Sequence, residues 1–212
     1  MVTDWNEMGV VRGDDAHDRC GWCVSAPDYV AYHDEEWGRP VTDDVLLYEK
    51  ICLEGFQSGL SWLTILRKRE GFRRAFAGFA PEVVAEFGPH HVERLVADAA
   101  IVRHRGKIEA AIANARATIV AQERHGSLAA VVWSFEPDRA GRRAPERMGD
   151  LPATTVESTA LSKALRKLGF RFVGPTTAYA AMQSLGVVND HLAGCHVRAA
   201  CERDRLAVDV PK

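Results

Sequence analysis

The 212-residue sequence contains no run of about 18 apolar residues, the length that a membrane-spanning helix requires. Its N-terminus is acidic and lacks the basic-then-apolar pattern of a secretory signal peptide. Cysteine is sparse, and an odd count of five favours reduced thiols or metal ligands over a disulfide framework. We therefore expect a cytoplasmic protein with no membrane partner. No heptad pattern is present either, so a monomer is the default expectation.

Strand-like alternation, internal repeats and low-complexity tracts are also missing. Apolar residues instead recur at helical spacing, and an all-α fold follows. Residues 20–40 are rich in aromatics and read as irregular, with one helical turn at most, and residues 136–157 read as a surface loop. Gly169 and Gly186 end the last two predicted helices as left-handed stops. The predicted helices cover 45–58, 62–76, 81–87, 90–98, 103–124, 127–135, 158–168 and 175–185.

The net charge of −2 hides an asymmetry between the two parts of the chain. Residues 1–60 carry 13 acidic and 4 basic side chains, whereas residues 61–212 carry 16 acidic and 23 basic ones. A nucleic-acid-binding protein needs a basic face rather than a basic whole. Because solvated helices would produce similar counts, charge alone leaves DNA binding and an ordinary surface both open.

Four residues of metal-ligating type lie near the two ends of the sequence. Cys20 and His33 are close to the N-terminus, and His191 and Cys195 form a His-x₃-Cys pair whose spacing puts both side chains on one face of a helical turn. Two imidazoles and two thiolates would complete a closed, structural zinc site. The alternative is that buried cysteines act as small apolar residues and the histidines are unrelated. Other residues compete as ligands, namely His17, Cys23, His196 and Cys201.

A carboxylate lies on an apolar helical stripe, because Glu54 shares a face with Leu47 and Ile51. An acid in such a place is paired, protonated or functional, and a surface-edge position or a structural ion pair remains the alternative. The loop that follows carries Gly59 and Leu60. An exposed leucine at a loop tip can act as a wedge in a base stack, although a core leucine would read the same.

Two further features suit a nucleic acid without requiring one. The aromatic side chains of Trp22, Tyr29, Tyr32 and Trp62 could form a purine-sized pocket, or an ordinary core. A tight turn at 98–102 joins two predicted helices, and the second helix begins with a basic segment. Its free backbone N–H groups can hold a phosphate, but a plain helical hairpin is equally compatible. The basic side chains at this helix start are Arg103, Arg105 and Lys107.

Taken together, the segments 20–22, 29–38, 51–62, 101–108, 170–174 and 188–191 closely resemble the 3-methyladenine DNA glycosylase I family. The resemblance runs from about residue 20 to residue 195. It implies a helix-hairpin-helix fold: a single domain of two closely packed helical lobes over 20–195, in which a zinc clasp joins the terminal segments. Residues 1–19, expected to be a flexible acidic extension, and the C-terminal tail 196–212 fall outside it.

The resemblance also implies roles for individual residues. The structural Zn²⁺ ligands carry over onto Cys20, His33, His191 and Cys195. The base pocket carries over onto Glu54 with Tyr29, Tyr32, Trp62 and Trp22, the intercalating loop onto Gly59 and Leu60, and the DNA-binding hairpin onto 98–107. One departure is Ala100, where the family often has glycine, since a positive φ there would strain alanine.

The implied reaction is the flipping of N3-methyladenine out of double-stranded DNA and hydrolysis of its N-glycosidic bond, which starts base excision repair. No motif places a lysine nucleophile, so we expect a monofunctional glycosylase without lyase activity. Three alternatives stay open at this stage: an enzyme for another alkylated base on the same scaffold, a non-catalytic zinc-stabilised DNA-binding module, and a small-molecule hydrolase with a basic face.

Overall fold

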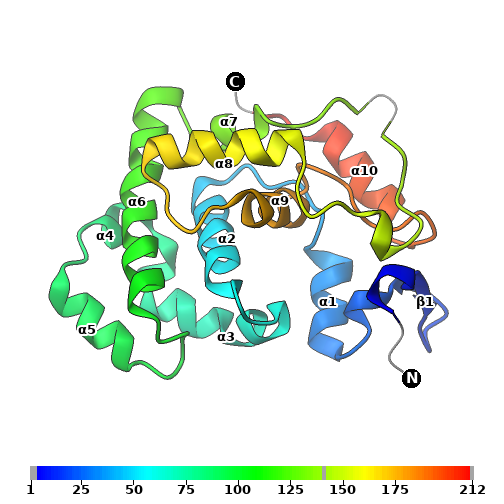
Figure 1. Ribbon diagram of the computed structural model, residues 1–212, viewed down its shortest axis with the longest axis horizontal. Coiled ribbons are helices and arrows are strands. Elements are labelled where there is room, and N and C mark those ends of the chain that lie inside the picture. The colour runs from blue at the N-terminus through cyan, green and yellow to red at the C-terminus, as the bar shows by residue number, and fades with distance from the viewer. Residues whose placement is uncertain (1–3, 140–141, 211–212) are drawn as a thin grey trace.

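The computed structural model describes residues 4–139 and 142–210, and this part of the chain is predominantly helical (Figure 1). None of its helices is both long and apolar enough to cross a membrane. The α-helices are α1 (Pro27–Glu35), α2 (Asp44–Gln57), α3 (Trp62–Ala75), α4 (Pro81–Ala85), α5 (Pro89–Ala97), α6 (Arg105–His125), α7 (Leu128–Trp133), α8 (Val156–Leu168), α9 (Pro175–Ser184) and α10 (Arg198–Ala207). The short elements are η1 (Trp5–Glu7), η2 (Gly21–Cys23), η3 (Ala77–Phe79), η4 (Met148–Asp150), β1 (Val10–Arg12) and β2 (Asp18–Cys20).

Helix α2 is the centre of the molecule and packs against α3, α6, α7 and α9 (Figure 1). Every residue from 47 to 56 is buried, as expected for a helix that is covered on all sides. The side chain of Asp43 caps the helix by accepting a hydrogen bond from the Leu46 amide at 2.9 Å. The hydroxyl of Tyr48 donates to the Ala111 carbonyl at 2.8 Å and ties α2 to α6. Because α2 is enclosed in this way, the carboxylate of Glu54, in the last turn of the helix, lies inside the protein.

All the helices predicted from apolar spacing are present, with ends that shift by a few residues. The largest helix begins at Arg105 rather than at Arg103, because His104 takes the capping position and its Nδ1 accepts a hydrogen bond from the Lys107 amide at 3.2 Å. The predicted stops Gly169 and Gly186 both have positive φ. Periodicity therefore located the buried framework correctly.

Two helices were not expected. Helix α1 occupies the segment predicted to be irregular, and α10 lies in the predicted tail. Pro27 starts α1 at a position where its missing N–H costs nothing. Both helices are short, nine and ten residues, and their polar composition hid the apolar spacing.

The expectation of no strands is wrong for residues 4–19, where β1 and β2 form a small antiparallel hairpin that pairs Val10 with Cys20 and Arg12 with Asp18. Three-residue strands are too short to show a period of two. The expected flexible extension is therefore hydrogen-bonded from residue 4 onward, and residues 1–3 lie outside the described part of the chain. The domain boundaries stay a prediction.

The N-terminal hairpin β1–β2 and the segment that leads into α10 lie close together, at the right of Figure 1. The His196 amide donates to the Asp18 carbonyl at 2.8 Å, and Arg39 pairs with Asp204 at 2.5 Å. This proximity brings the two distant pairs of metal-ligating residues within reach of each other.

Candidate active site and metal group

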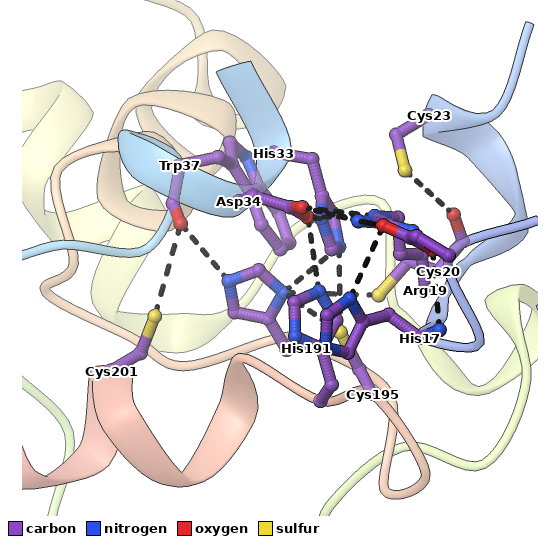
Figure 2. A network of polar contacts seen from close by, with 12 residues as sticks. His17, Arg19, Cys20, Cys23, His33, Asp34, Trp37, His191, Cys195 and Cys201 are labelled. Carbon is purple, nitrogen blue, oxygen red and sulfur yellow. Dashed lines mark hydrogen bonds and ion pairs between the residues drawn. The ribbon is translucent and has the colours of Figure 1, made fainter. Parts of the chain in front are cut away.

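The four predicted metal ligands meet in one buried cluster, which we call the metal group: Cys20, His33, His191 and Cys195. One ligand atom from each residue lies within 4.8 Å of all the others, and Figure 2 shows the four side chains converging. His191 Nδ1 lies 3.2 Å from His33 Nε2 and 3.6 Å from Cys195 Sγ. Ligand atoms in a tetrahedral site with bonds of about 2.0–2.3 Å lie about 3.3–3.8 Å apart. The spacing therefore fits a metal ion, although His191 and Cys195 lie in a turn segment rather than on a helix.

Neighbouring groups orient both histidine rings for this purpose. His33 Nδ1 lies 2.7 Å from a carboxylate oxygen of Asp34, and His191 Nε2 lies 2.9 Å from the Trp37 carbonyl (Figure 2). These contacts leave the other nitrogen of each ring facing the group. The Leu192 amide donates to Cys20 Sγ at 3.3 Å, which suits a thiolate. Metal-binding histidines are held by second partners in just this manner.

The competing ligands point elsewhere. The Cys23 thiol donates to the Cys20 carbonyl at 3.2 Å, and Cys201 Sγ lies 4.0 Å from the Trp37 carbonyl (Figure 2). The rings of His17 and His196 stack on each other with centroids 4.5 Å apart. The positions of the side chains therefore favour the four predicted residues as candidate metal ligands over these other cysteines and histidines.

A pocket of about 220 Å³ opens between α1, α2, α3 and α9. This volume is below the 300–1,000 Å³ or so that drug-sized ligands occupy, and it suits a ligand about as large as one base. All five predicted pocket residues line it. Its lining comprises Trp5, Trp22, Tyr29, Tyr32, Trp37, Glu54, Gln57, Trp62, Met148, Leu151, Ala180 and Gln183.

The aromatic walls support each other. Tyr29 and Tyr32, one turn apart on α1, are roughly parallel with ring centroids 6.5 Å apart, and Trp62 lies 5.4 Å from Tyr32. Trp22 meets Tyr29 edge-on at 4.9 Å and reaches His33 of the metal group at 5.2 Å. The indole Nε1 of Trp62 is buried and has no hydrogen-bond partner among the described residues. Residues 20–33 therefore contribute to the pocket wall through Trp22, Tyr29 and Tyr32, and to the metal group through Cys20 and His33.

Glu54 is the carboxylate at this pocket and only 5% of its surface is exposed. Burial raises its pKa to about 7, while the nearby ammonium of Lys50 and a hydrogen bond with Ser184 both lower it. Lys50 lies one helical turn earlier; it donates to the Tyr32 hydroxyl at 3.2 Å and to Glu36 at 2.9 Å. Glu54 thus titrates near neutrality instead of forming a permanent ion pair.

The predicted wedge lies on the surface. Leu60 is 43% exposed, which rules out the core position, and Gly59 has φ +83° with open space around it. Lys107 does not take the exposed position that a phosphate contact requires, because it is 8% exposed and its ammonium donates to the carbonyls of Phe56 at 2.9 Å and Ser58 at 2.6 Å. Lys107 instead anchors the loop that carries Leu60.

The helical hairpin is formed by α5, the turn 98–104 and α6. Arg103 is exposed at this turn, and the exposed Arg105 pairs with Glu93 across it at 2.8 Å. Ala100 does not adopt a positive φ, so the backbone strain that a left-handed alanine would cause is absent. The glycine that the hairpin needs is Gly71 on α3, where a Cβ would lie 2.5 Å from the Ala100 carbonyl oxygen.

The sequence model for methyladenine glycosylases matches residues 22–199. The chain belongs to the methyladenine glycosylase family. It is 50% identical over 178 residues to DNA-3-methyladenine glycosylase 1 of Escherichia coli, covering 84% of this chain and 95% of that protein. A crystal structure of a 3-methyladenine DNA glycosylase I superposes with a TM-score of 0.80 at 49% identity, covering 84% of this chain and 98% of that one.

A third relative of this glycosylase, from Staphylococcus aureus, was solved to explain 3-methyladenine recognition. It is 34% identical, with a TM-score of 0.81, and the match covers 85% of this chain and 96% of that one. The resemblance inferred from the sequence is confirmed by these matches.

Sequence reasoning missed several pocket residues of this family member. Trp37 stands in the aromatic segment, but nothing set it apart from its neighbours. Lys50, which lies beside the pocket and not in its lining, could have been found from its spacing of four residues before Glu54 on one helix. Trp5, Met148 and Gln183 carried no local signal, because only tertiary packing brings them to the pocket.

Proposed function

We propose that this protein is a DNA-3-methyladenine glycosylase that flips N3-methyladenine out of double-stranded DNA and hydrolyses its N-glycosidic bond, starting base excision repair. The observation that carries the proposal is a buried carboxylate, Glu54, in an aromatic pocket the size of a single base. The names of the relatives agree with it. The protein is proposed to act as a cytoplasmic monomer.

The chemistry of the lesion explains why one carboxylate is enough. Methylation at N3 leaves the adenine positively charged, so the base departs readily without a proton from the enzyme. When the C1′–N9 bond breaks, its electron pair neutralises the base, and water adds to the oxocarbenium-like sugar carbon and releases one proton to the solvent. The pocket therefore needs to bind and hold the charged base rather than to activate water.

Glu54 is proposed to attract the cationic base and to accept a hydrogen bond from its exocyclic amino group. The faces of Tyr29 and Trp62 add cation–π attraction of about 0.5–2 kcal/mol at each ring. Neutral adenine gains neither charge interaction, which explains how damaged DNA is distinguished from undamaged DNA. The unpartnered N–H of Trp62 is a donor that an acceptor nitrogen of the bound base would satisfy.

The DNA contacts are proposed on the loop and the hairpin. Leu60 would enter the base stack as the lesion leaves it, and Lys107 keeps that loop in place through the two carbonyls it binds. The first backbone amides of α6, with Arg103 and Arg105, would bind phosphates without reading sequence. These contacts position the duplex so that the flipped base reaches Glu54.

The metal group is proposed to hold a structural Zn²⁺ on two thiolates and two imidazoles. When bound, the ion supplies stability rather than catalysis, since four protein ligands leave it no open position. Cys20 and His33 hold the N-terminal segment, while His191 and Cys195 hold the segment before α10. The arrangement fixes Trp22 and α1, which form one side of the pocket.

Base release from methylated duplex DNA, measured by chromatography, tests the proposal. Glu54→Gln is expected to slow single-turnover release of 3-methyladenine by about 100-fold, in the range seen when one aligned electrostatic partner is removed, with folding retained. The exposed Glu82→Gln on α4 is the matched control and should behave as the native protein. Release of 3-methyladenine at an unchanged rate by Glu54→Gln would disprove the role of this carboxylate.

The wedge is tested separately with Leu60→Ala. Release from duplex DNA should fall about tenfold, because flipping costs a few kcal/mol of unstacking that the wedge offsets. Binding of free 3-methyladenine should not change, since Leu60 does not line the pocket. A parallel loss of free-base binding would place Leu60 in a structural role instead.

A further inference from the structure

The segment before the family match folds back over the base pocket. Trp5, on η1, lines the pocket together with Met148 and Leu151 from the η4 region. The family model begins only at residue 22, so Trp5 lies before the part of the chain that the family shares, whereas Met148 and Leu151 lie within it.

The position of this segment is fixed by close packing. The Met148 amide donates to the Met8 carbonyl at 2.8 Å, and Glu7 pairs with Arg147 at 2.8 Å. Gly149 is required at this contact, because a Cβ there would lie 2.7 Å from the Asn6 carbonyl oxygen. Hairpin β1–β2 continues the attachment down to Cys20 of the metal group. Trp5 is thus held at the pocket from both sides.

The indole of Trp5 is the free aromatic surface of the pocket. It is 54% exposed and makes no ring contact within residues 4–139 and 142–210, whereas each of the other five aromatic pocket residues packs against another ring. A large exposed aromatic side chain that lines a pocket is a ready surface for a flat ligand. Its electron-rich face would meet a positively charged purine favourably.

We propose that Trp5 contacts the flipped alkylated base directly and is a specificity-determining residue for cationic purines. The indole, as part of the pocket lining, adds a ring face to those that attract the positive charge. This inference rests on the proposed function, since it names a further residue that recognises the same substrate.

The test compares Trp5→Ala, Trp5→Phe and the control Val11→Ala, which removes an exposed apolar side chain from the same extension away from the pocket. Calorimetric titration with 3,9-dimethyladeninium, whose methyl group on N9 takes the place of the sugar carbon and keeps the positive charge, should show about 2–30-fold weaker binding by Trp5→Ala, which is the cation–π range of about 0.5–2 kcal/mol expressed as affinity. Trp5→Phe should retain most of the affinity, and the control all of it. Melting temperatures should agree among all four proteins.

Neutral 9-methyladenine, titrated in parallel, separates a charge-dependent contact from a purely steric wall. The loss in Trp5→Ala should be smaller for 9-methyladenine than for 3,9-dimethyladeninium. Equal affinity of Trp5→Ala and native protein for 3,9-dimethyladeninium would overturn the inference, as would an equal loss for both ligands. If native protein releases no 3-methyladenine from DNA, the proposed function fails; if it does and Trp5→Ala binds as tightly, only this inference fails.

Discussion

The metal group and the base pocket share α1 and the segment before it, but they differ in whether their buried polar atoms have hydrogen-bond partners. In the metal group each histidine ring has a second partner, and Cys20 accepts a backbone hydrogen bond. In the pocket the Trp62 N–H has no partner within the part of the chain that the structure describes, and burial raises the pKa of Glu54 to about 7. Buried polar groups that satisfy each other stabilise a fold, whereas those left unsatisfied mark the place of a ligand.

Removing a metal ligand should give the largest effect and should act on stability. A metal present at a thousand times its dissociation constant stabilises by about 4 kcal/mol, which for a protein of this size corresponds to about 8–16 °C. We expect Cys195→Ala to lower the melting temperature by that amount and to lose bound metal, as measured by differential scanning fluorimetry and elemental analysis.

The control for this experiment is Cys52→Ala, another buried cysteine, on α2, whose Sγ lies 3.7 Å from the Asn114 side chain and outside the metal group. Its metal content should equal that of the native protein. If Cys195→Ala kept the native melting temperature without metal, the metal group would not be what stabilises the terminal segments.

The pH dependence of kcat/KM should show that the pocket depends on the charge of Glu54. Glu54 has a raised pKa in the folded protein, so lowering the pH below about 7 protonates it and removes the charge that attracts the base. The rate should fall about 50-fold between pH 7 and pH 5, approaching tenfold per pH unit well below the pKa, and Glu54→Gln should show no such slope. A slope that persists in Glu54→Gln would assign the titration to another group.

The raised pKa of Glu54 also makes the stability of the folded protein depend on pH. Stability falls as the pH rises, whereas the rate increases. A carboxyl group whose pKa is raised on folding stabilises the protein below its unfolded value near 4.5 and loses that contribution as the pH rises through 7. Glu54→Gln should therefore raise the melting temperature at pH 8 more than at pH 5. Thermal melts at these two pH values measure the difference.

A smaller effect is expected from the support of the metal ligands. Asp34→Asn keeps a hydrogen bond to His33 but removes the charge, and such second partners usually account for 10–100-fold in metal affinity. Competition with a chelator measures this, and Asp28→Asn, an acid on the same helix paired with Arg67, serves as control. Base release at saturating metal should not change.

The smallest expected effect concerns Lys50, the buried cation beside the pocket. Lys50→Met removes a charge that lowers the pKa of Glu54, so the midpoint of the pH profile should move upward and activity at pH 7 should fall about 3–10-fold. Lys50→Arg keeps the charge and should restore the midpoint. An unchanged midpoint in Lys50→Met would show that burial alone sets the titration of Glu54.

The sequence was informative where a feature is local or belongs to a motif. Apolar spacing located α2 and α6, and the quoted motifs singled out the buried Glu54 and the four residues of the metal group. The hairpin β1–β2 escaped because three-residue strands carry too little pattern, and the burial of Lys107 escaped because it depends on carbonyls from another helix. Trp5 could not be predicted, because its place depends on contacts with η4, far along the chain.

The metal group also sets how the molecule would respond to a pulling force. Its ligands lie just outside α2–α9 in the sequence, so a bound ion closes the chain between residues 33 and 191 into a loop. Tension applied to the two chain ends would first detach β1 and α10 and then load the metal–ligand bonds. Helix α2 with Glu54, the loop with Leu60 and the hairpin would stay relaxed until those bonds broke, so a bound ion would shield the pocket and its neighbouring elements from the applied force.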